Sequence, residues 1–310
     1  MPKLLSIIIP VYNEEKIIPE LYQRVSDVAS NITDDYELIF VNDGSRDHTF
    51  LEIINLAEKD KHVFYINFSR NFGHQIAVTA GLDKCRGHFV AIIDGDMQDP
   101  PELIKDMYDK MQEGYDVVYA KRNKRKGESF FKKATAKLFY RLLRNITDID
   151  IPLDTGDFRI MKRKVVDYLK KMPEQNKFLR GQITWLGFKQ TAVLFDRDKR
   201  KYGSTGYPLK KMLRFALDGI TSFSDKPLIF VSKLGLIISI LAVCIIFYAL
   251  YSHFVIGKTV TGWTSLIIST MFIGGIQLVS IGIIGLYISR MNKNILNRPL
   301  YIIDESNLED

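Results

Sequence analysis

The chain has 310 residues, of which 46% are hydrophobic and 25% charged, the composition of a globular protein with one large domain or two modest ones. Its net charge of +7 suits partners that carry phosphate, such as nucleotides, acidic lipids or nucleic acid. Two cysteines, Cys85 and Cys244, exclude a disulfide-rich scaffold, and the start Met-Pro-Lys before a strand-like run predicts no cleavable signal peptide.

Short apolar runs alternate with helical patterns through the first part of the chain. The runs are too short for helices and lack the alternation of half-buried strands, so they predict buried strands. They are Leu4–Val11, Tyr36–Val41, Val63–Asn67, Phe89–Ile93 and Asp116–Ala120, with helical spacing that reaches Val28, covers Thr49–Lys59 and ends at Leu82. This order predicts a mostly parallel, doubly wound α/β sheet.

Polar side chains follow three of these strands, at the edge where open α/β sheets bind ligands. Right-handed crossovers should bring Tyr12–Glu14, Asp43 and Asp94–Gln98 together at that edge. The sequence has neither a G-x-G-x-x-G loop after the first strand nor a Walker-type lysine. A bound diphosphate therefore has to be held by a metal and by basic side chains.

Asp94, Asp96 and Gln98 point the same way if the chain stays extended after its strand. Two carboxylates and an amide oxygen suit a hard divalent cation, Mg²⁺ or Mn²⁺, that holds a diphosphate. The alternative is a polar turn that closes the strand, with Pro100–Pro101 as its stop.

Three motifs, in this order, carry a family resemblance. They are Ser-Ile-Ile-Ile-Pro-Val-Tyr-Asn-Glu-Glu at 6–15, Val-Asn-Asp-Gly-Ser-Arg-Asp at 41–47 and Asp-Gly-Asp-Met-Gln-Asp-Pro-Pro-Glu at 94–102. With them the chain resembles family 2 glycosyltransferases, which have the Rossmann-like GT-A fold. Within that family it is most similar to the polyprenyl-phosphate group, which includes bactoprenol glucosyltransferases and dolichyl-phosphate mannose synthase. The resemblance covers nearly the whole chain.

The resemblance implies roles for the matching residues. It implies that the donor nucleoside is held by Pro10, Tyr12, Glu14 and Asp43. It implies that the metal and the donor diphosphate are held by Asp94, Asp96 and Gln98. Asp157 is expected to face the acceptor, and Arg200, with Lys201 as the second choice, is expected to contact the diphosphate.

Two further positions bear on substrate class. Arg122 lies in the charge run Lys121–Lys126 just after a strand end, where it would contact phosphate; a solvated loop is the alternative. Thr184 stands before Trp185, where processive members of the wider family have an arginine. This difference argues against a polysaccharide synthase.

Residues from about 228 to 289 are almost uncharged. Within them, Leu234–Tyr251 and Leu266–Ile288 are about long enough to cross a bilayer, and a buried helical hairpin is the alternative. The link between them holds only Lys258, whereas three basic residues follow the second run. This asymmetry places both termini in the cytoplasm. The three are Arg290, Lys293 and Arg298.

Two basic amphipathic segments, Phe130–Arg144 and Leu209–Ile220, are suited to an anionic membrane surface. For the first, a packed surface helix is the alternative. We therefore expect a cytoplasmic catalytic domain over 1–205, an interface segment over 206–227, a two-helix transmembrane domain over 228–290 and a cytoplasmic tail over 291–310.

These features predict a multi-pass enzyme of the inner (plasma) membrane, aided by Mg²⁺ or Mn²⁺. It would move a hexose, with inversion, from a nucleotide to polyprenyl phosphate for cell-envelope glycosylation. UDP-glucose is the favoured donor because the two spans resemble those of bactoprenol glucosyltransferases. A GDP-mannose donor, a non-catalytic nucleotide-sugar-binding scaffold and a homo-oligomer stay open. Nucleic acid is not expected as a partner, since no recognised module for it occurs.

Overall fold

The computed structural model describes residues 4–122, 155–195, 224, 226–251, 255 and 262–308, and the statements below concern these residues. The strands are β1 (Leu5–Val11), β2 (Tyr36–Asn42), β3 (Val63–Phe68), β4 (Phe89–Ile92), β5 (Val117–Arg122), β6 (Thr155–Lys162), β7 (Gln190–Phe195) and β8 (Ile303–Ser306). The helices are α1 (Ile18–Ser30), α2 (Thr49–Ala57), α3 (His74–Lys84), α4 (Leu103–Gln112), α6 (Arg163–Lys170), α7 (Leu179–Trp185), α9 (Lys226–Tyr251) and α10 (Trp263–Leu296).

β1 lies inside a single sheet with the strand order β7-β5-β6-β4-β1-β2-β3-β8. It pairs in parallel with β2 and β4, and β2 pairs in parallel with β3. Every residue of β1 and β2 is buried, as expected for parallel strands covered on both faces. The predicted α/β class, with a mostly parallel central sheet, is confirmed.

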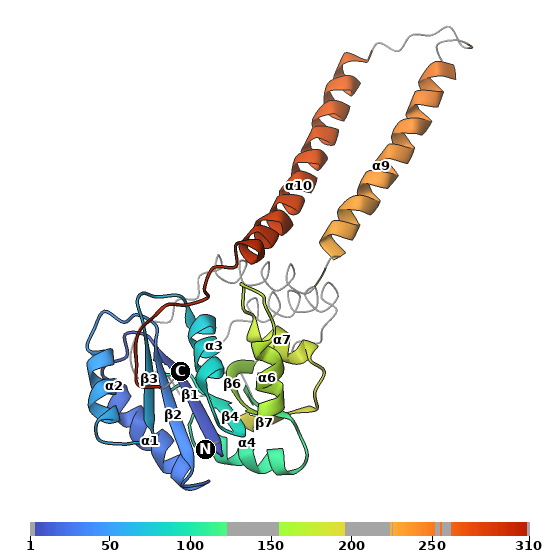
Figure 1. Cartoon of the computed structure of the whole chain (residues 1–310). Coiled ribbons are helices and arrows are strands. Elements are labelled where there is room, and N and C mark those ends of the chain that lie inside the picture. Colours follow the sequence, from blue (N-terminus) through green and yellow to red (C-terminus); the bar gives the residue numbers. More distant parts are fainter. Residues whose placement is uncertain are drawn as a thin grey trace.

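Helices cover both faces of the sheet (Figure 1). On one face, Ile7 and Ile9 of β1 belong to a core shared with apolar side chains of α1, α2 and α4. On the other face, Ile8 belongs to a second core, shared with α3, α6 and α7. Successive residues of β1 enter opposite cores because side chains alternate across a strand. The uninterrupted apolar run of β1 follows from this double coverage.

Two strands run against the parallel core. β6 lies between β4 and β5 and is antiparallel to both, and β8 is antiparallel to β3 at the edge of the sheet. Because β6 runs in the opposite direction, its first residues lie at the edge where β4 ends. Arg159 is opposite Ile92, so Asp157, two residues earlier, faces Asp94, two residues later.

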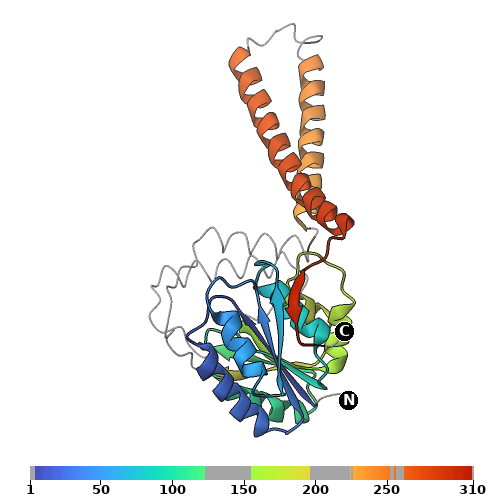
Figure 2. The ribbon, with the colours of Figure 1, turned by 60° about the vertical axis from the view of Figure 1, so that its left-hand side comes forward.

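The segment after α10 returns to the α/β body, where β8 extends the sheet (Figure 2). The amide of Ser69 donates to the carbonyl of Ile302 at 3.1 Å. The Tyr301 ring stacks on Phe68 with centroids 5.2 Å apart, and its hydroxyl donates to Asp83 Oδ2 at 3.0 Å. The predicted tail over 291–310 therefore contains the end of α10 and a strand of the catalytic sheet.

α9 and α10 project together away from the α/β body (Figures 1 and 2). Lys226–Ile245 has a mean hydropathy of 2.6 and Phe272–Leu296 of 1.9, and 0% of either stretch is buried. This exposure argues against a buried helical hairpin, because the apolar side chains of such a hairpin would be covered. By length and composition, both helices are able to cross a membrane. Phe130–Arg144 and Leu209–Ile220 lie outside the described residues.

Candidate active site

A pocket of about 440 Å³ opens at the carboxyl ends of β1, β2 and β4, beside the first residues of β6. Seven of the residues predicted for the site line it: Pro10, Tyr12, Glu14, Asp43, Asp94, Asp96 and Asp157. Three lining residues to which the sequence analysis gave no role are His74, Gln75 and Arg180. The predicted convergence of strand ends is thus what the topology produces, although the role of each residue remains a prediction.

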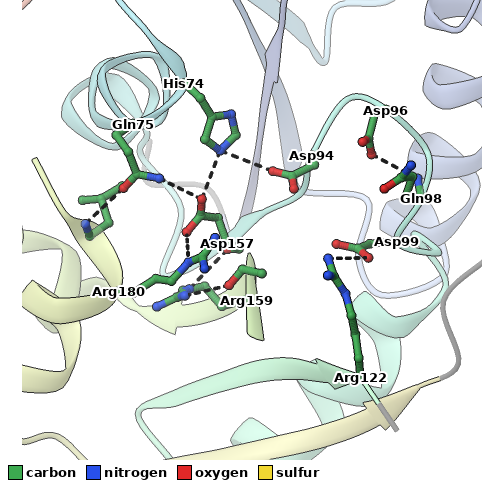
Figure 3. Close-up of polar contacts among 12 residues, drawn as sticks. His74, Gln75, Asp94, Asp96, Gln98, Asp99, Arg122, Asp157, Arg159 and Arg180 are labelled. Atoms are coloured by element: carbon green, nitrogen blue, oxygen red, sulfur yellow. Dashed lines mark hydrogen bonds and ion pairs between the residues drawn. The ribbon is translucent and has the colours of Figure 1, made fainter. Parts of the chain in front are cut away.

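Asp157 contacts three polar side chains of the pocket (Figure 3). Its Oδ1 accepts a hydrogen bond from Arg180 Nε at 2.7 Å. Its Oδ2 accepts one from Gln75 Nε2 at 2.7 Å and lies 3.2 Å from His74 Nε2. Gln75 Oε1 in turn accepts the amide of Leu179 at 3.1 Å. Asp157 therefore joins the amino-terminal ends of α3 and α7.

The backbone below Asp157 is also fixed. The buried Arg159 side chain donates from Nε to the carbonyl of Asp157 at 3.2 Å and from Nη2 to the carbonyl of Gly156 at 3.0 Å. A buried guanidinium that satisfies two carbonyls at the start of a strand limits the movement of that strand end. Asp157 thus has both its carboxylate and its backbone held in place.

These contacts set the charge state of the pocket. Burial alone would raise the pKa of Asp157, but the Arg180 guanidinium and the hydrogen bonds from His74 and Arg180 hold that pKa well below its usual range. Burial alone would lower the pKa of His74, but the hydrogen bond to Asp157 and the charge of Asp94 raise it to about 9. At neutral pH, Asp157 is therefore a carboxylate between two cations.

Asp94 differs from Asp157 in its contacts. Its Oδ1 is buried without a hydrogen-bond partner in the described part of the chain, and His74 Nε2 lies 3.4 Å away. Burial raises the pKa of Asp94, and the neighbouring carboxylates Asp157 and Asp96 raise it further, whereas His74 lowers it. A buried carboxylate oxygen that accepts no hydrogen bond is suited to bind a cation.

Gly95, the residue between the two aspartates, has no room for a side chain. A Cβ at this position would lie 2.8 Å from Val11 Cγ1 and 2.9 Å from the carbonyl oxygen of Pro10. Only a glycine lets the turn after β4 approach the end of β1 this closely. The Asp-Gly-Asp sequence therefore places Asp94 and Asp96 next to Pro10, in the same pocket.

The chain turns after β4. The prediction that the side chains of Asp94, Asp96 and Gln98 point the same way required an extended chain there. Met97 has φ +53°, and the amide of Gln98 turns back to donate to Asp96 Oδ1 at 3.1 Å. Gln98 is buried and is not among the residues that line the pocket. The turn explains this difference, because a residue with positive φ reverses the course of the backbone. A metal contact by Gln98 remains an untested prediction.

Asp43 supports the pocket as well as lining it. Its Oδ1 accepts the amide of Phe72 at 2.7 Å, and its Oδ2 accepts that of Gly73 at 3.0 Å. Burial raises the pKa of Asp43, and these two amides counteract the rise. The carboxylate thereby positions the turn that leads into α3, which carries His74 and Gln75.

The basic residues predicted to contact phosphate are placed differently. Arg122, at the end of β5, is not among the pocket-lining residues; its Nη2 lies 3.8 Å from Oδ1 of the buried Asp99. The same nitrogen is 3.7 Å from the position of a Cβ built on Gly156, so Arg122 borders the turn that carries Asp157. Arg200 and Lys201 lie outside the described residues.

The sequence predicts no role for His74, Gln75 or Arg180. His74 and Gln75 begin α3, and the segment that joins it to β3 starts at the same sheet edge as the other predicted site residues, so their position was a usable signal. Arg180 opens α7, and no local pattern indicates that its guanidinium reaches a carboxylate 23 residues earlier in the chain.

Two sets of side chains compete as metal ligands. His74, Asp94 and Asp157 offer ligand atoms within 4.8 Å of one another. Asp157, however, already binds Arg180, whose permanent charge would repel a cation at that carboxylate. Asp94 Oδ1 lies farther from its cation, at 3.4 Å from His74 Nε2, and accepts no hydrogen bond from the described residues, and Asp96 lies in the same pocket. Asp94 with Asp96 is therefore the better pair.

A mixed α/β sheet with an acidic pocket at the ends of its parallel strands is typical of GT-A glycosyltransferases. Residues 6–169 match the family model described as Glycosyl transferase family 2, and the chain belongs to this family. Among solved structures, it is similar to glucosyl-3-phosphoglycerate synthase from Mycobacterium tuberculosis, with 18% identity, a TM-score of 0.47 and coverage of 71% of this chain and 78% of that one.

Several related proteins align with nearly the full length of this chain. The chain is 52% identical to the uncharacterized glycosyltransferase YkcC of Bacillus subtilis (strain 168), over 97% of this chain and 93% of the relative. It is 40% identical to the prophage bactoprenol glucosyl transferase homolog of Escherichia coli (strain K12), over 96% and 98%. It is 39% identical to the SfII prophage-derived bactoprenol glucosyl transferase of Shigella flexneri, over 97% and 98%.

Proposed function

We propose that this glycosyltransferase moves glucose from UDP-glucose to a membrane polyprenyl phosphate. One observation carries the proposal: two pairs of side chains line the same pocket. One is the acidic pair Asp94 and Asp96, and the other is the ion pair of Asp157 with Arg180. The first pair suits a metal-bound diphosphate and the second suits a polar acceptor. The relatives named bactoprenol glucosyl transferase, which match over almost their whole length, support the lipid acceptor and the glucosyl donor.

Asp94 and Asp96 would hold Mg²⁺ or Mn²⁺. The buried Oδ1 of Asp94, which accepts no hydrogen bond from the described residues and lies 3.4 Å from His74 Nε2, is a hard oxygen ligand that fits either ion. When bound, the ion supplies positive charge that stabilises the departing nucleoside diphosphate. The protein's own share is to orient the donor between Tyr12, Glu14 and the acidic pair, and Arg200 and Lys201 remain the predicted basic contacts to the diphosphate.

Asp157 is better suited to orient groups than to accept a proton. A general base works best with a pKa near the operating pH, and the pKa of Asp157 lies well below its usual range. Both of its oxygens already accept hydrogen bonds. The acceptor phosphate is anionic near neutral pH and needs little deprotonation. In this proposal, Asp157 holds Arg180 and His74, and these two cations receive the acceptor phosphate.

The attack would proceed in one displacement. A phosphate oxygen of the acceptor forms a bond to the anomeric carbon while the bond from that carbon to the nucleoside diphosphate breaks. Attack opposite to the leaving group inverts the anomeric configuration. α9 and α10 would anchor the enzyme in the inner membrane, which brings the pocket to the bilayer surface where a lipid phosphate lies.

The test is transfer measured on the purified full-length protein. UDP-glucose, UDP-galactose and GDP-mannose are each incubated with a short-chain polyprenyl phosphate and Mg²⁺ or Mn²⁺, and the lipid product is identified by mass spectrometry. We expect hexosyl polyprenyl phosphate from UDP-glucose and much less from the other donors. Product from GDP-mannose alone would replace the glucosyl assignment by a mannosyl one. Donor binding without product from any donor would favour a non-catalytic scaffold.

A further inference from the structure

A second cavity, of about 320 Å³, lies where the chain leaves α10 and returns to the catalytic fold. Its walls come from α3, the carboxyl-terminal end of α6, the connection from α6 to α7 and residues 297–300. The described residues that line it all differ from those that line the active-site pocket. It is therefore a separate cavity with its own chemistry.

The charged side chains of this cavity are mostly basic. Among the described residues, Lys170, Lys177 and Arg298 line it together with one carboxylate, Asp83. Asp83 accepts a hydrogen bond from the Tyr301 hydroxyl through Oδ2 at 3.0 Å. The cavity therefore carries an excess of positive charge that suits an anion.

The two lysines have donors to spare. Lys170 Nζ donates to the backbone carbonyl of Asp83 at 2.7 Å, and Lys177 Nζ donates to that of Met172 at 2.6 Å. Each ammonium group has three donors, and a neutral carbonyl does not balance its charge. Burial lowers the pKa of Lys177, and the charges of Glu174 and Asp83 offset part of that fall. Apolar side chains, among them Leu82, Leu169 and Leu300, complete the lining.

The position of the cavity along α10 indicates where its ligand comes from. The amide of Gln175, in the cavity wall, donates to Oδ1 of Asn294 at 3.1 Å. Asn294 lies four residues beyond Arg290, the first charge after the apolar part of α10. With the hydrocarbon edge placed at Arg290, Asn294 lies roughly 6 Å beyond it at 1.5 Å per residue, within a headgroup layer about 5–8 Å thick.

Exposed aromatic side chains lie beside this cavity. Tyr168 and Trp185 are 52% and 63% exposed, and together with Met172 and Pro173 they line a neighbouring surface groove. Met172 and Pro173 also line the basic cavity, so the groove and the cavity share a corner. Tyrosine and tryptophan are enriched where proteins meet the membrane–water interface.

We propose that this cavity binds the phosphate headgroup of an anionic membrane phospholipid. The phosphate lies between Lys170, Lys177 and Arg298, and the acyl chains follow α10 into the bilayer. The site rests on the proposed membrane span of α10 and not on the identity of the sugar donor. A bound lipid would tie the catalytic domain to the bilayer through α6 and the chain after α10.

The test uses the full-length protein in a neutral detergent. Binding of fluorescently labelled phosphatidylglycerol is titrated and compared with labelled phosphatidylcholine. The variant Lys170→Gln/Lys177→Gln/Arg298→Gln removes the basic set, and Lys59→Gln/Lys61→Gln/Lys105→Gln makes the same charge change at exposed lysines away from the cavity. We expect wild type to prefer phosphatidylglycerol, the first variant to bind it at least about tenfold more weakly, and the control to bind like wild type.

Arg298→Gln alone changes an exposed side chain in the segment after α10 and keeps the test valid if the triple variant misfolds. Its binding should fall by about tenfold with an unchanged thermal unfolding midpoint. Equal binding by wild type and Arg298→Gln, or equal binding of phosphatidylcholine, would overturn the proposal. Stronger displacement by inorganic phosphate or by short-chain polyprenyl phosphate than by unlabelled phosphatidylglycerol would assign the cavity to another phosphate and overturn it too. None of these readouts depends on sugar transfer.

Discussion

Arg180 Nε lies 2.7 Å from Asp157 Oδ1, and this ion pair joins the first turn of α7 to the first residues of β6. The Asp157 side chain is 6% exposed and that of Arg180 28%, so the pair is only partly screened by water. Removing one partner of such a pair leaves the other charge uncompensated, which costs more than the pair itself contributes. Arg180 and Asp157 should therefore act as one unit in catalysis.

The first prediction tests this unit with a double-mutant cycle. Asp157→Asn and Arg180→Gln should each slow single-turnover transfer by about a hundredfold or more, because the acceptor loses its orientation. The double variant should be little slower than either single variant, since both remove the same arrangement. Donor binding, measured by calorimetry, should change little in Asp157→Asn.

This view would be contradicted if the rate loss of the double variant equalled the product of the rate losses of the two single variants. Independent effects would mean that Asp157 acts separately from Arg180, for example as a general base. Asp167→Asn, an exposed acid on α6, is the control and should transfer sugar at the wild-type rate.

The second prediction concerns the metal. Asp94→Asn and Asp96→Asn should each weaken Mn²⁺-dependent binding of a nucleoside diphosphate by at least about tenfold, because even outer ligand partners of metals contribute that much. The thermal unfolding midpoint of Asp94→Asn should not fall, since burial penalises the charge that the substitution removes. Chelation of the ion should reduce wild-type binding to the level of these variants.

Asp109→Asn is a matched control, because Asp109 is an exposed acid of α4 paired with Lys105. Its metal-dependent binding should equal that of wild type. Full metal dependence in both Asp94→Asn and Asp96→Asn would show that the ion is held elsewhere.

The third prediction concerns the turn that sets Asp43. Gly44 has φ +66°, and a Cβ there would lie 2.4 Å from the backbone carbon of Arg70. Gly44→Ala should therefore add a backbone clash to the roughly 1–2 kcal/mol of left-handed strain. It should shift the turn at Phe72 and Gly73, whose amides Asp43 accepts, and thereby weaken donor binding. It should also lower the unfolding midpoint.

Gly187→Ala separates strain from clash. Gly187 has φ +70°, and nothing lies within 4 Å of its Cβ position. This variant should lose only the strain contribution, with a smaller fall in the midpoint and unchanged donor binding. Equal effects of the two substitutions would mean that the contact with Arg70 is relieved without cost.

The fourth prediction concerns membrane topology. β8 belongs to the catalytic sheet, so the residues after α10 must lie on the same side of the membrane as β3. The link between α9 and α10 should then lie on the opposite side. In a Cys244→Ala background, Val255→Cys should react with an impermeant maleimide from outside sealed cells, and Asn292→Cys should react only after permeabilisation. Labelling of both from one side would mean that α9 or α10 does not span.

The parallel half of the fold and the acidic edge of the pocket are predictable from the sequence alone. The five predicted strands agree with β1 to β5 within two residues at each end. Strands buried on both faces leave a continuous apolar signal, and the right-handed crossover rule then fixes where Tyr12, Asp43 and Asp94 meet. These are local patterns combined with one general rule, so a single sequence is enough to read them.

How Asp157 reaches Asp94, and what holds it there, can be seen only in the folded protein. The insertion of β6 against β4, the return of β8 to β3 and the contact of Arg180 with Asp157 join distant parts of the chain. The turn at Met97, which removes Gln98 from the pocket lining, likewise depends on how the end of β4 packs against β1. Strand direction and side-chain partners across the sheet are chosen by the packing of the whole domain, and no local run of residues records that choice.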